Sequence, residues 1–191
     1  VGTIDDRSFN QGSWEGLKKY AEEKGITHKY YQPTEKTTDA YIDSIDLAVA
    51  AGAKIVVTPG FLFEPAIYKA QDIHPEVNFV LLDGSPQDGN YKDFRIEKNV
   101  YSVFYAEEEA GFLAGYGAVK EGYTNLGFMG GMAVPAVVKF GYGFVQGVNY
   151  AAKEFGIKNV KVDYNYIGGF NPSPETQTKA ASWYKNGVQV I

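Results

Sequence analysis

Residues 77–84 of this chain, VNFVLLDG, carry the pattern that decides its fold. The run from Val77 to Leu82 is almost continuously apolar and lacks the polar alternation of a strand that faces water on one side. It therefore predicts a strand buried on both faces, as in parallel sheets covered by helices. Asp83 and Gly84 then end the strand with residue types that favour turns.

Working outward from this strand, predicted strands and helices alternate along the chain. The extended segments are residues 27–32, 54–58, 77–82, 94–104, 125–129, 159–166 and those from 188 onward. The predicted helices are residues 11–24, 39–51, the segment after Phe61 through His74, 106–120, 136–155 and 174–186. Such alternation is typical of βαβ units and a parallel sheet. We predict an α/β fold with two lobes, residues 1–103 and 104–191, and a cleft between them.

Polar and aromatic residues gather where the predicted strands of the first lobe end. Ligands of open parallel sheets bind outside the carboxyl ends of the strands. Three segments should meet there: residues 5–10, the turn at residues 59–61, and Asp83 with Gly84. The candidate ligand-binding residues are Ser8, Phe9, Asn10, Gly60, Phe61 and Asp83, with Phe140 near the start of a predicted helix in the second lobe.

Each candidate also has a purely structural explanation. Ser8 lies three residues before Gln11 and fits a capping box, in which side chains close a helix start without touching a ligand. Asp83 fits the cap of a turn through Gly84. A Phe such as Phe61 is commonly buried, and Phe140 belongs to an apolar stripe that is mainly core.

Composition and motifs exclude several classes of function. A net charge of -5, a pI near 5.1 and the lack of clustered Lys and Arg disfavour a nucleic-acid surface. The chain has no Cys, so it offers no disulfide and no thiolate metal site or nucleophile. It has no phosphate-binding loop and no nucleophile elbow, and Gly141, Gly143 and Gly147 lie within a predicted helix without dinucleotide-binding spacing. We therefore predict no cofactor, no metal ion and no enzymatic activity.

Several separated motifs resemble the basic membrane protein (BMP) family of ABC-transporter substrate-binding lipoproteins, the PnrA-like group. They are DDRSFNQGSWEGL (5–17), TPGF (58–61), FVLLDG (79–84), GFLAGYGA (111–118) and GGMAVPAVVKFGYGFVQGV (130–148). The resemblance implies the type I periplasmic-binding-protein fold, with two doubly wound lobes and a purine nucleoside held in the cleft. It also implies a lipid anchor on the extracytoplasmic face of a bacterial membrane, and an ABC permease as partner.

The resemblance assigns a role to individual residues. It implies that Phe9 stacks on the base with Ser8 and Asn10 as polar neighbours, that Asp83 lies on the ribose side, and that Phe140 covers the other base face. The family's acidic base contact precedes the position of Val1, and its later ribose-binding Asp and Lys follow Ile191. We therefore expect a segment truncated at both ends that does not bind at full affinity alone.

Three functions remain open from the sequence. The first is a receptor that captures a purine nucleoside, such as adenosine, guanosine or inosine, without chemistry. The second is an α/β enzyme acting on a nucleoside or sugar, with Asp83 as general acid or base; the absence of a positioned nucleophile disfavours it. The third is a binding protein of the same fold for a sugar or signalling ligand.

Overall fold

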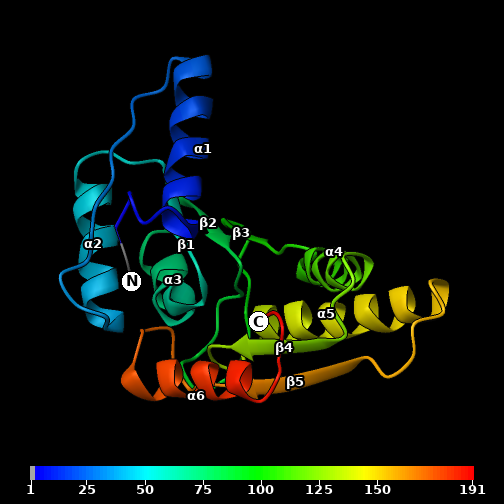
Figure 1. Ribbon diagram of the computed structural model, residues 1–191. Coiled ribbons are helices and arrows are strands. Elements are labelled where there is room, and N and C mark those ends of the chain that lie inside the picture. Colours follow the sequence, from blue (N-terminus) through cyan, green and yellow to red (C-terminus); the bar gives the residue numbers. More distant parts are fainter. Residues whose placement is uncertain (1–2) are drawn as a thin grey trace. The chain divides into compact units, whose positions relative to one another are not determined.

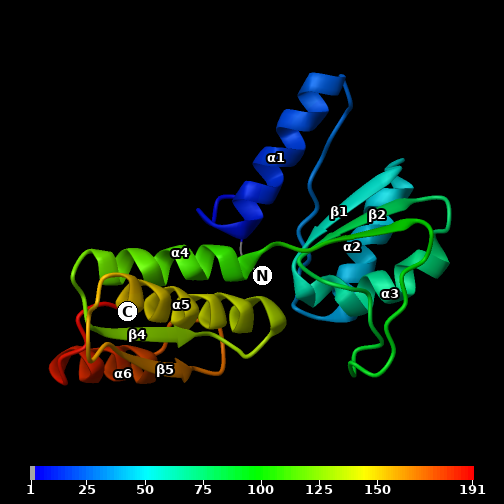
Figure 2. The same cartoon turned by 90° about the vertical axis from the view of Figure 1, so that its right-hand side faces the viewer.

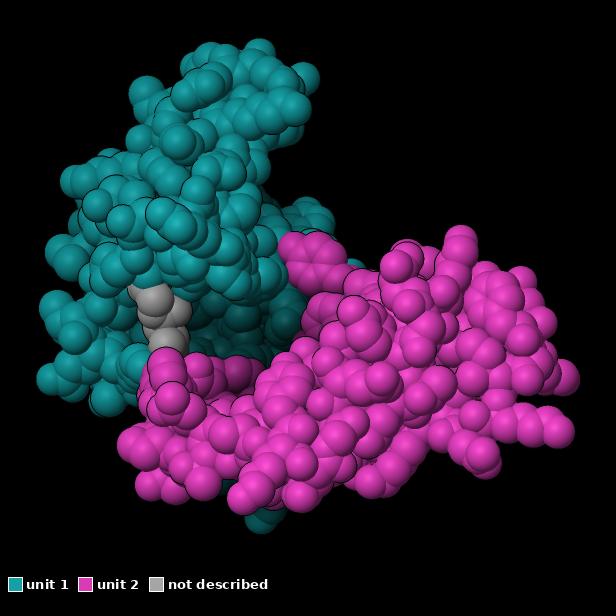
Figure 3. Space-filling view, in the orientation of Figure 1, with its two compact units in different colours: residues 1–104 teal, residues 105–191 magenta. Residues whose placement is uncertain are grey.

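The computed structural model describes residues 3–191, and the chain divides into two compact units, residues 1–104 and 105–191 (Figure 3). The first unit contains α1 (Phe9–Lys24), α2 (Thr38–Ala50), β1 (Ile55–Pro59), the short 3-10 helix η1 (Phe61–Phe63), α3 (Glu64–Ile73), β2 (Asn78–Leu82) and β3 (Val100–Val103). The second contains α4 (Glu107–Lys120), β4 (Asn125–Gly130), α5 (Pro135–Glu154), β5 (Lys161–Tyr166) and α6 (Pro174–Lys185) (Figure 1). No helix of the described residues is long and apolar enough to cross a bilayer.

The sheet of the first unit is parallel, with strand order β1-β2-β3. Phe79 and Leu81 of β2 are fully buried against α2 and α3, and each such side chain contributes about 1.5–3 kcal/mol to folding. The core comprises Tyr41, Ile45, Ala66, Ile67, Ala70, Val77, Phe79, Leu81 and Val100. The prediction that β2 is buried on both faces is wrong: its other residues are half-buried or exposed, because α2 and α3 pack on the Phe79 and Leu81 side.

Three predicted extended segments differ from the structure. Residues 27–32 are irregular, because no strand of the described chain supplies the backbone partners that a strand requires. The final segment forms a single parallel bridge, between Val190 and Leu126. In residues 94–104 only Val100–Val103 becomes a strand.

The second unit has three layers, of which the parallel pair β4-β5 is the middle one. Helices α5 and α6 lie on opposite faces of this pair, as both views show (Figures 1 and 2). Leu126 is buried with Val148 of α5, while the neighbouring Gly127 faces Trp183 of α6. Alternation along β4 thus sends successive side chains to the two helical layers.

Glycines bring α4 and α5 into backbone contact. A Cβ placed on Gly111 or Gly115 would overlap the carbonyl of Phe140 or Phe144, and one on Gly143 would overlap the carbonyl of Glu108. The contacts advance in the same direction on both helices, so α4 and α5 run parallel. The glycines of residues 111–118 in the sequence indicate close packing against a neighbour; Gly111 and Gly115 confirm this, whereas Gly117 has nothing within 4 Å of its Cβ position.

Asp6 caps α1, and the predicted capping box at Ser8 is wrong. Asp6 Oδ1 accepts from the amides of Ser8 and Gln11 at 2.8 and 3.1 Å, while the Ser8 side chain makes no capping bond. Asp6 Oδ2 accepts from Asn10 Nδ2 at 2.7 Å. A carboxylate with two acceptor oxygens satisfies more of the free amides at the helix start than one hydroxyl, so Asp6 takes the role expected of Ser8.

The glycine contacts predict opposite effects for two substitutions on α4. Gly111→Ala forces a methyl group into the α5 backbone, so we expect a loss of about 1–3 kcal/mol in the free energy of unfolding. Gly117→Ala is the matched control, since its Cβ has space and Ala favours a helix by about 1 kcal/mol over Gly. Urea unfolding followed by circular dichroism measures both, and equal midpoints would contradict the packing argument.

The Asp6 cap predicts a pH-dependent start of α1. Partial loss of hydration raises the pKa of the Asp6 carboxyl, but hydrogen bonds from the Gln11, Ser8 and Asn10 amides and the Asn10 side chain outweigh it, so the pKa lies below its ordinary value. The cap is therefore complete above the ordinary pKa and is lost as the pH falls through the lowered one. We expect less protection of the Gln11 amide from hydrogen exchange, relative to the unfolded chain at the same pH, in acid and, at neutral pH, in Asp6→Ala. Asp5→Ala is the control, because the Asp5 carboxylate bonds Thr3.

Candidate functional site

Gly60 ties together the carboxyl ends of β1 and β2. Its amide donates to the Leu82 carbonyl at 2.7 Å, one step beyond the last ladder pair, Pro59 with Leu82. Its φ of 94° lies in a region that L side chains rarely adopt, so glycine suits this turn. The Gly60 carbonyl then accepts from Phe63 and starts η1.

Phe9 rests against the Gly60 turn. The Cβ position of Gly60 lies 3.7 Å from Phe9 Cε1, an ordinary van der Waals distance. The Phe9 side chain stays 38% exposed although it contacts the turn. Phe9 therefore presents aromatic surface to solvent from a defined position, the first residue of α1.

Asp83 follows β2 in a left-handed conformation with φ 56°. Its amide donates to the Val103 carbonyl at 2.7 Å, so its backbone is anchored to β3. Asp tolerates this region better than most residues, and such conformations cluster at functional sites. Because Gly60 binds the carbonyl just before Asp83, the structure brings Phe9, Gly60 and Asp83 to one edge of the sheet. We call these three residues the first rim.

The polar neighbours of Phe9 differ in their surroundings. Ser8 is exposed at the N-cap of α1, next to the first rim. Asn10 is half-buried, and its side-chain amide donates to Asp6. Asn10 therefore supports the cap in addition to any contact with a ligand.

Phe61 lies in a separate small pocket on the side of α2 and α3. This pocket, of about 190 Å³, is lined by Lys36, Thr38, Tyr41, Phe61, Leu62, Pro65, Gln87, Gly89 and Tyr91. Its volume suits a fragment or one side chain rather than a whole nucleoside, since ligand pockets usually span about 300–1,000 Å³. Phe61 thus follows Gly60 in the chain and lines this pocket, whereas Phe9 is not among the lining residues.

In the second unit an aromatic ring also lies on a glycine turn at a strand end. Phe170 follows β5 and packs on Gly131, which follows β4; a Cβ on Gly131 would overlap the Phe170 ring. Phe170 remains 52% exposed. We call Gly131 and Phe170 the second rim.

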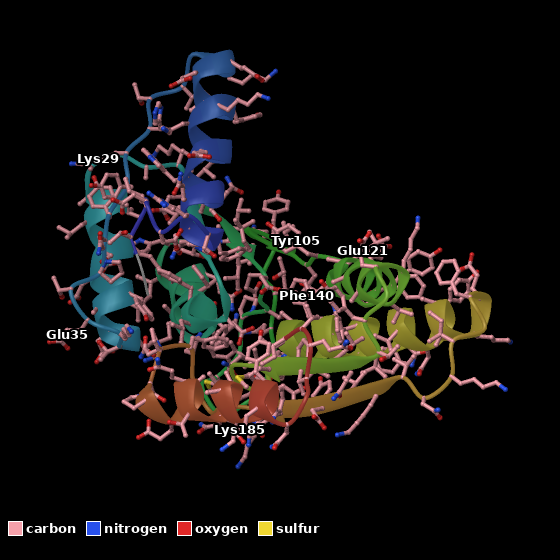
Figure 4. The ribbon with its side chains drawn as sticks, viewed as in Figure 1. Lys29, Glu35, Tyr105, Glu121, Phe140 and Lys185 are labelled. Atoms are coloured by element: carbon pink, nitrogen blue, oxygen red, sulfur yellow. The ribbon has the colours of Figure 1, made fainter. Side chains whose placement is uncertain are left out.

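Phe140 projects from α5 near its start and is 42% exposed (Figure 4). Its carbonyl faces Gly111, so the α4–α5 contact fixes its backbone. The neighbouring Lys139 pairs with the buried Glu107 at 3.2 Å.

Two residues of interest escaped the sequence interpretation. Phe170 had a visible signal, since Gly168, Gly169 and Phe170 repeat after a predicted strand the Gly-aromatic order of Gly60 and Phe61. Glu64, which lies beneath the turn after Asp83, had none, because hydrogen bonding between distant residues leaves no local pattern. In the described part of the chain, no group of three or more His, Asp or Glu side chains could hold a metal ion.

Comparison with known proteins identifies the family. The family model described as "ABC transporter substrate-binding protein PnrA-like" (Bmp) matches residues 1–191. The "ABC transporter nucleoside-binding protein BmpA" of Lactococcus lactis is 33% identical over 98% of this chain and 51% of its own length. Basic membrane protein A2 of Borrelia garinii is 29% identical over 100% of this chain and 53% of its own. The chain thus spans about half the length of these relatives.

Solved structures give the same result. A solute-binding protein of an ABC transporter system from Aeropyrum pernix superposes with a TM-score of 0.77 at 25% identity, over 98% of this chain and 51% of that one. A second, from Conexibacter woesei, gives a TM-score of 0.72 at 21% identity, over 99% and 60%. These neighbours have the type I periplasmic-binding-protein fold, which confirms the predicted fold class. The chain therefore belongs to the Bmp family of PnrA-like ABC transporter substrate-binding proteins, which are binding components of transport systems and not enzymes.

Proposed function

We propose that this chain binds a purine nucleoside for an ABC importer by aromatic stacking and polar contacts. The observation that carries the proposal is the first rim, where an exposed aromatic ring and a carboxylate are held at adjoining strand ends by the Gly60 turn. A ring offers its face to a base, and a carboxylate offers several acceptor sites to ribose hydroxyls. The name of the Lactococcus lactis relative includes nucleoside binding, which supports the same ligand class.

The other candidate residues surround Phe9 and Asp83 in this proposal. Ser8 and Asn10 flank the stacked base, and the Gly60 turn supports the Phe9 ring at van der Waals distance. Phe61 borders the site on the α2 side, and Phe140 contributes aromatic surface from the second unit. Phe170 is an additional candidate for that second ring, since it has the same glycine support as Phe9.

Proteins of this family act outside the cytoplasm with a transporter permease as partner. We propose further that a lipid anchor holds this protein at the extracytoplasmic face of a bacterial membrane.

The expected ligands are adenosine, guanosine or inosine. Calorimetry with these nucleosides and with ribose tests the class of ligand. If only ribose gave heat on binding, the ligand would be a sugar and the nucleoside proposal would be wrong. Release of free base from a nucleoside would instead establish an enzyme.

Phe9→Ala should weaken nucleoside binding by about 1–3 kcal/mol, the range measured for loss of one base-stacking ring. Calorimetry of the full chain with inosine measures the change. Tyr20→Ala is the matched control, because Tyr20 is an exposed ring of the same helix, at 58%, and lies about three turns along α1 from Phe9. Unchanged affinity in Phe9→Ala would assign Phe9 a structural role only.

Asp83→Asn should weaken binding of a nucleoside much more than binding of the free purine base. The carboxylate accepts from ribose hydroxyls, which the base lacks, and a hydrogen bond to a charged group contributes about 1.5–3 kcal/mol. Asn also tolerates the left-handed backbone at this position, so the turn is kept. Competition with hypoxanthine and inosine gives the two affinities, and equal losses for both ligands would place Asp83 outside the ribose site.

A further inference from the structure

Glu64 is a buried carboxylate beneath the turn that carries Asp83. It is the first residue of α3 and is 7% exposed. Its Oε1 accepts from the Ser85 amide at 3.0 Å, and its Oε2 accepts from Gln87 Nε2 at 3.2 Å. One side chain thus joins the start of α3 to the chain that leaves β2.

The contact with this turn is close as well as polar. A Cβ placed on Gly84 would lie 3.0 Å from Glu64 Oε1 and 3.1 Å from its Cγ. Gly84 therefore leaves the space that Glu64 fills. Asp83, with its left-handed φ of 56°, is held between the Val103 carbonyl on one side and the Glu64-bound turn on the other.

The partners of Glu64 require two acceptors. Gln87 is 2% exposed, and its Oε1 already accepts from the amides of Gly89 and Tyr91 at 2.5 and 3.3 Å. Its side-chain amide therefore cannot flip without losing these bonds, and its NH₂ group stays directed at Glu64. An ionised carboxylate can accept from both the Ser85 amide and the Gln87 side-chain amide. A glutamine amide or a protonated carboxyl would instead bring a donor of its own close to one of these donors.

This arrangement has a cost that suggests a role beyond folding. Burial raises the pKa of Glu64, although hydrogen bonds from Ser85 and Gln87 oppose the shift. A charged group at this depth is expensive, and an apolar side chain of similar shape is often as stable. What an apolar residue lacks is the ability to hold the Ser85 amide.

We propose that Glu64 is a positioning residue of the ligand site, which holds residues 83–85 so that Asp83 is presented to the hydroxyls of the ligand. The inference rests on the proposed function for its ligand. Glu64 acts through the backbone of the turn and does not touch the ligand itself. Its substitution should therefore affect recognition of the sugar and leave stacking of the base at Phe9 intact.

Glu64→Gln is the direct test. It keeps the side-chain size and one oxygen that can accept from Ser85, but it places an NH₂ group against the NH₂ group of Gln87. We expect inosine affinity of the full chain to fall about tenfold, the lower end for a bond to a charged group, with hypoxanthine affinity unchanged. Glu64→Asp keeps the charge and should retain part of the inosine preference. It also serves as the test variant if Glu64→Gln does not fold.

Ile67→Val is the matched control, since it removes one buried methyl group of α3 and leaves the turn untouched. It should lower stability without changing the ratio of the two affinities. Equal losses of inosine and hypoxanthine in Glu64→Gln, or an unchanged ratio in Glu64→Gln when Asp83→Asn changes it, would overturn the positioning role.

Failure of the proposed function gives a different result, because wild-type protein would then bind no nucleoside at all. Amide hydrogen exchange tests positioning without a ligand. Faster exchange at Ser85 in Glu64→Leu, which removes both acceptors, with no change in Ile67→Val, supports the inference. Unchanged exchange at Ser85 would overturn it whether or not a nucleoside binds.

Discussion

The hydrogen bond from the Gly60 amide to the Leu82 carbonyl is the constraint on which the first rim depends. It extends the β1–β2 ladder by one step and sets where both strands stop. Because Asp83 follows that carbonyl, the same bond fixes the start of its turn, and the Phe9 ring packs at van der Waals distance from the Gly60 turn. The three residues of the first rim, which come from α1, β1 and the end of β2, are thus held together by one backbone contact.

The parts of the fold that the sequence predicted well are those specified by local patterns. The β-branched run at β1, the apolar run at β2 and the Ser173–Pro174 start of α6 each contain their own signal, and each element forms. Burial on both faces of β2 was not predictable in the same way, since it depends on which helices cover the sheet. Residues 27–32 have strand composition but no partner strand in the described chain, so composition alone was insufficient.

In the candidate site, too, local patterns were predictable from the sequence and contacts between distant residues were not. Asp83 and the Gly60 turn were visible as turn residues after strand patterns, so their meeting at one edge followed from parallel topology. Asp6 and not Ser8 forms the cap, which the capping-box spacing did not show, because several nearby oxygens compete for the same amides and spacing cannot rank them. Glu64 depends on Ser85 and Gln87, more than twenty positions away, and only the fold reveals that dependence.

The two rims solve one physical problem in the same way. An aromatic ring that stacks on a ligand must be exposed, yet an exposed ring that moves freely loses entropy on binding. Phe9 on Gly60 and Phe170 on Gly131 both rest on glycine, which supports a ring edge or face without covering it. Under the proposed function, this contact orders each ring before the ligand binds. Only at Gly131 would a Cβ overlap the ring, whereas glycine is required at residue 60 by its positive φ.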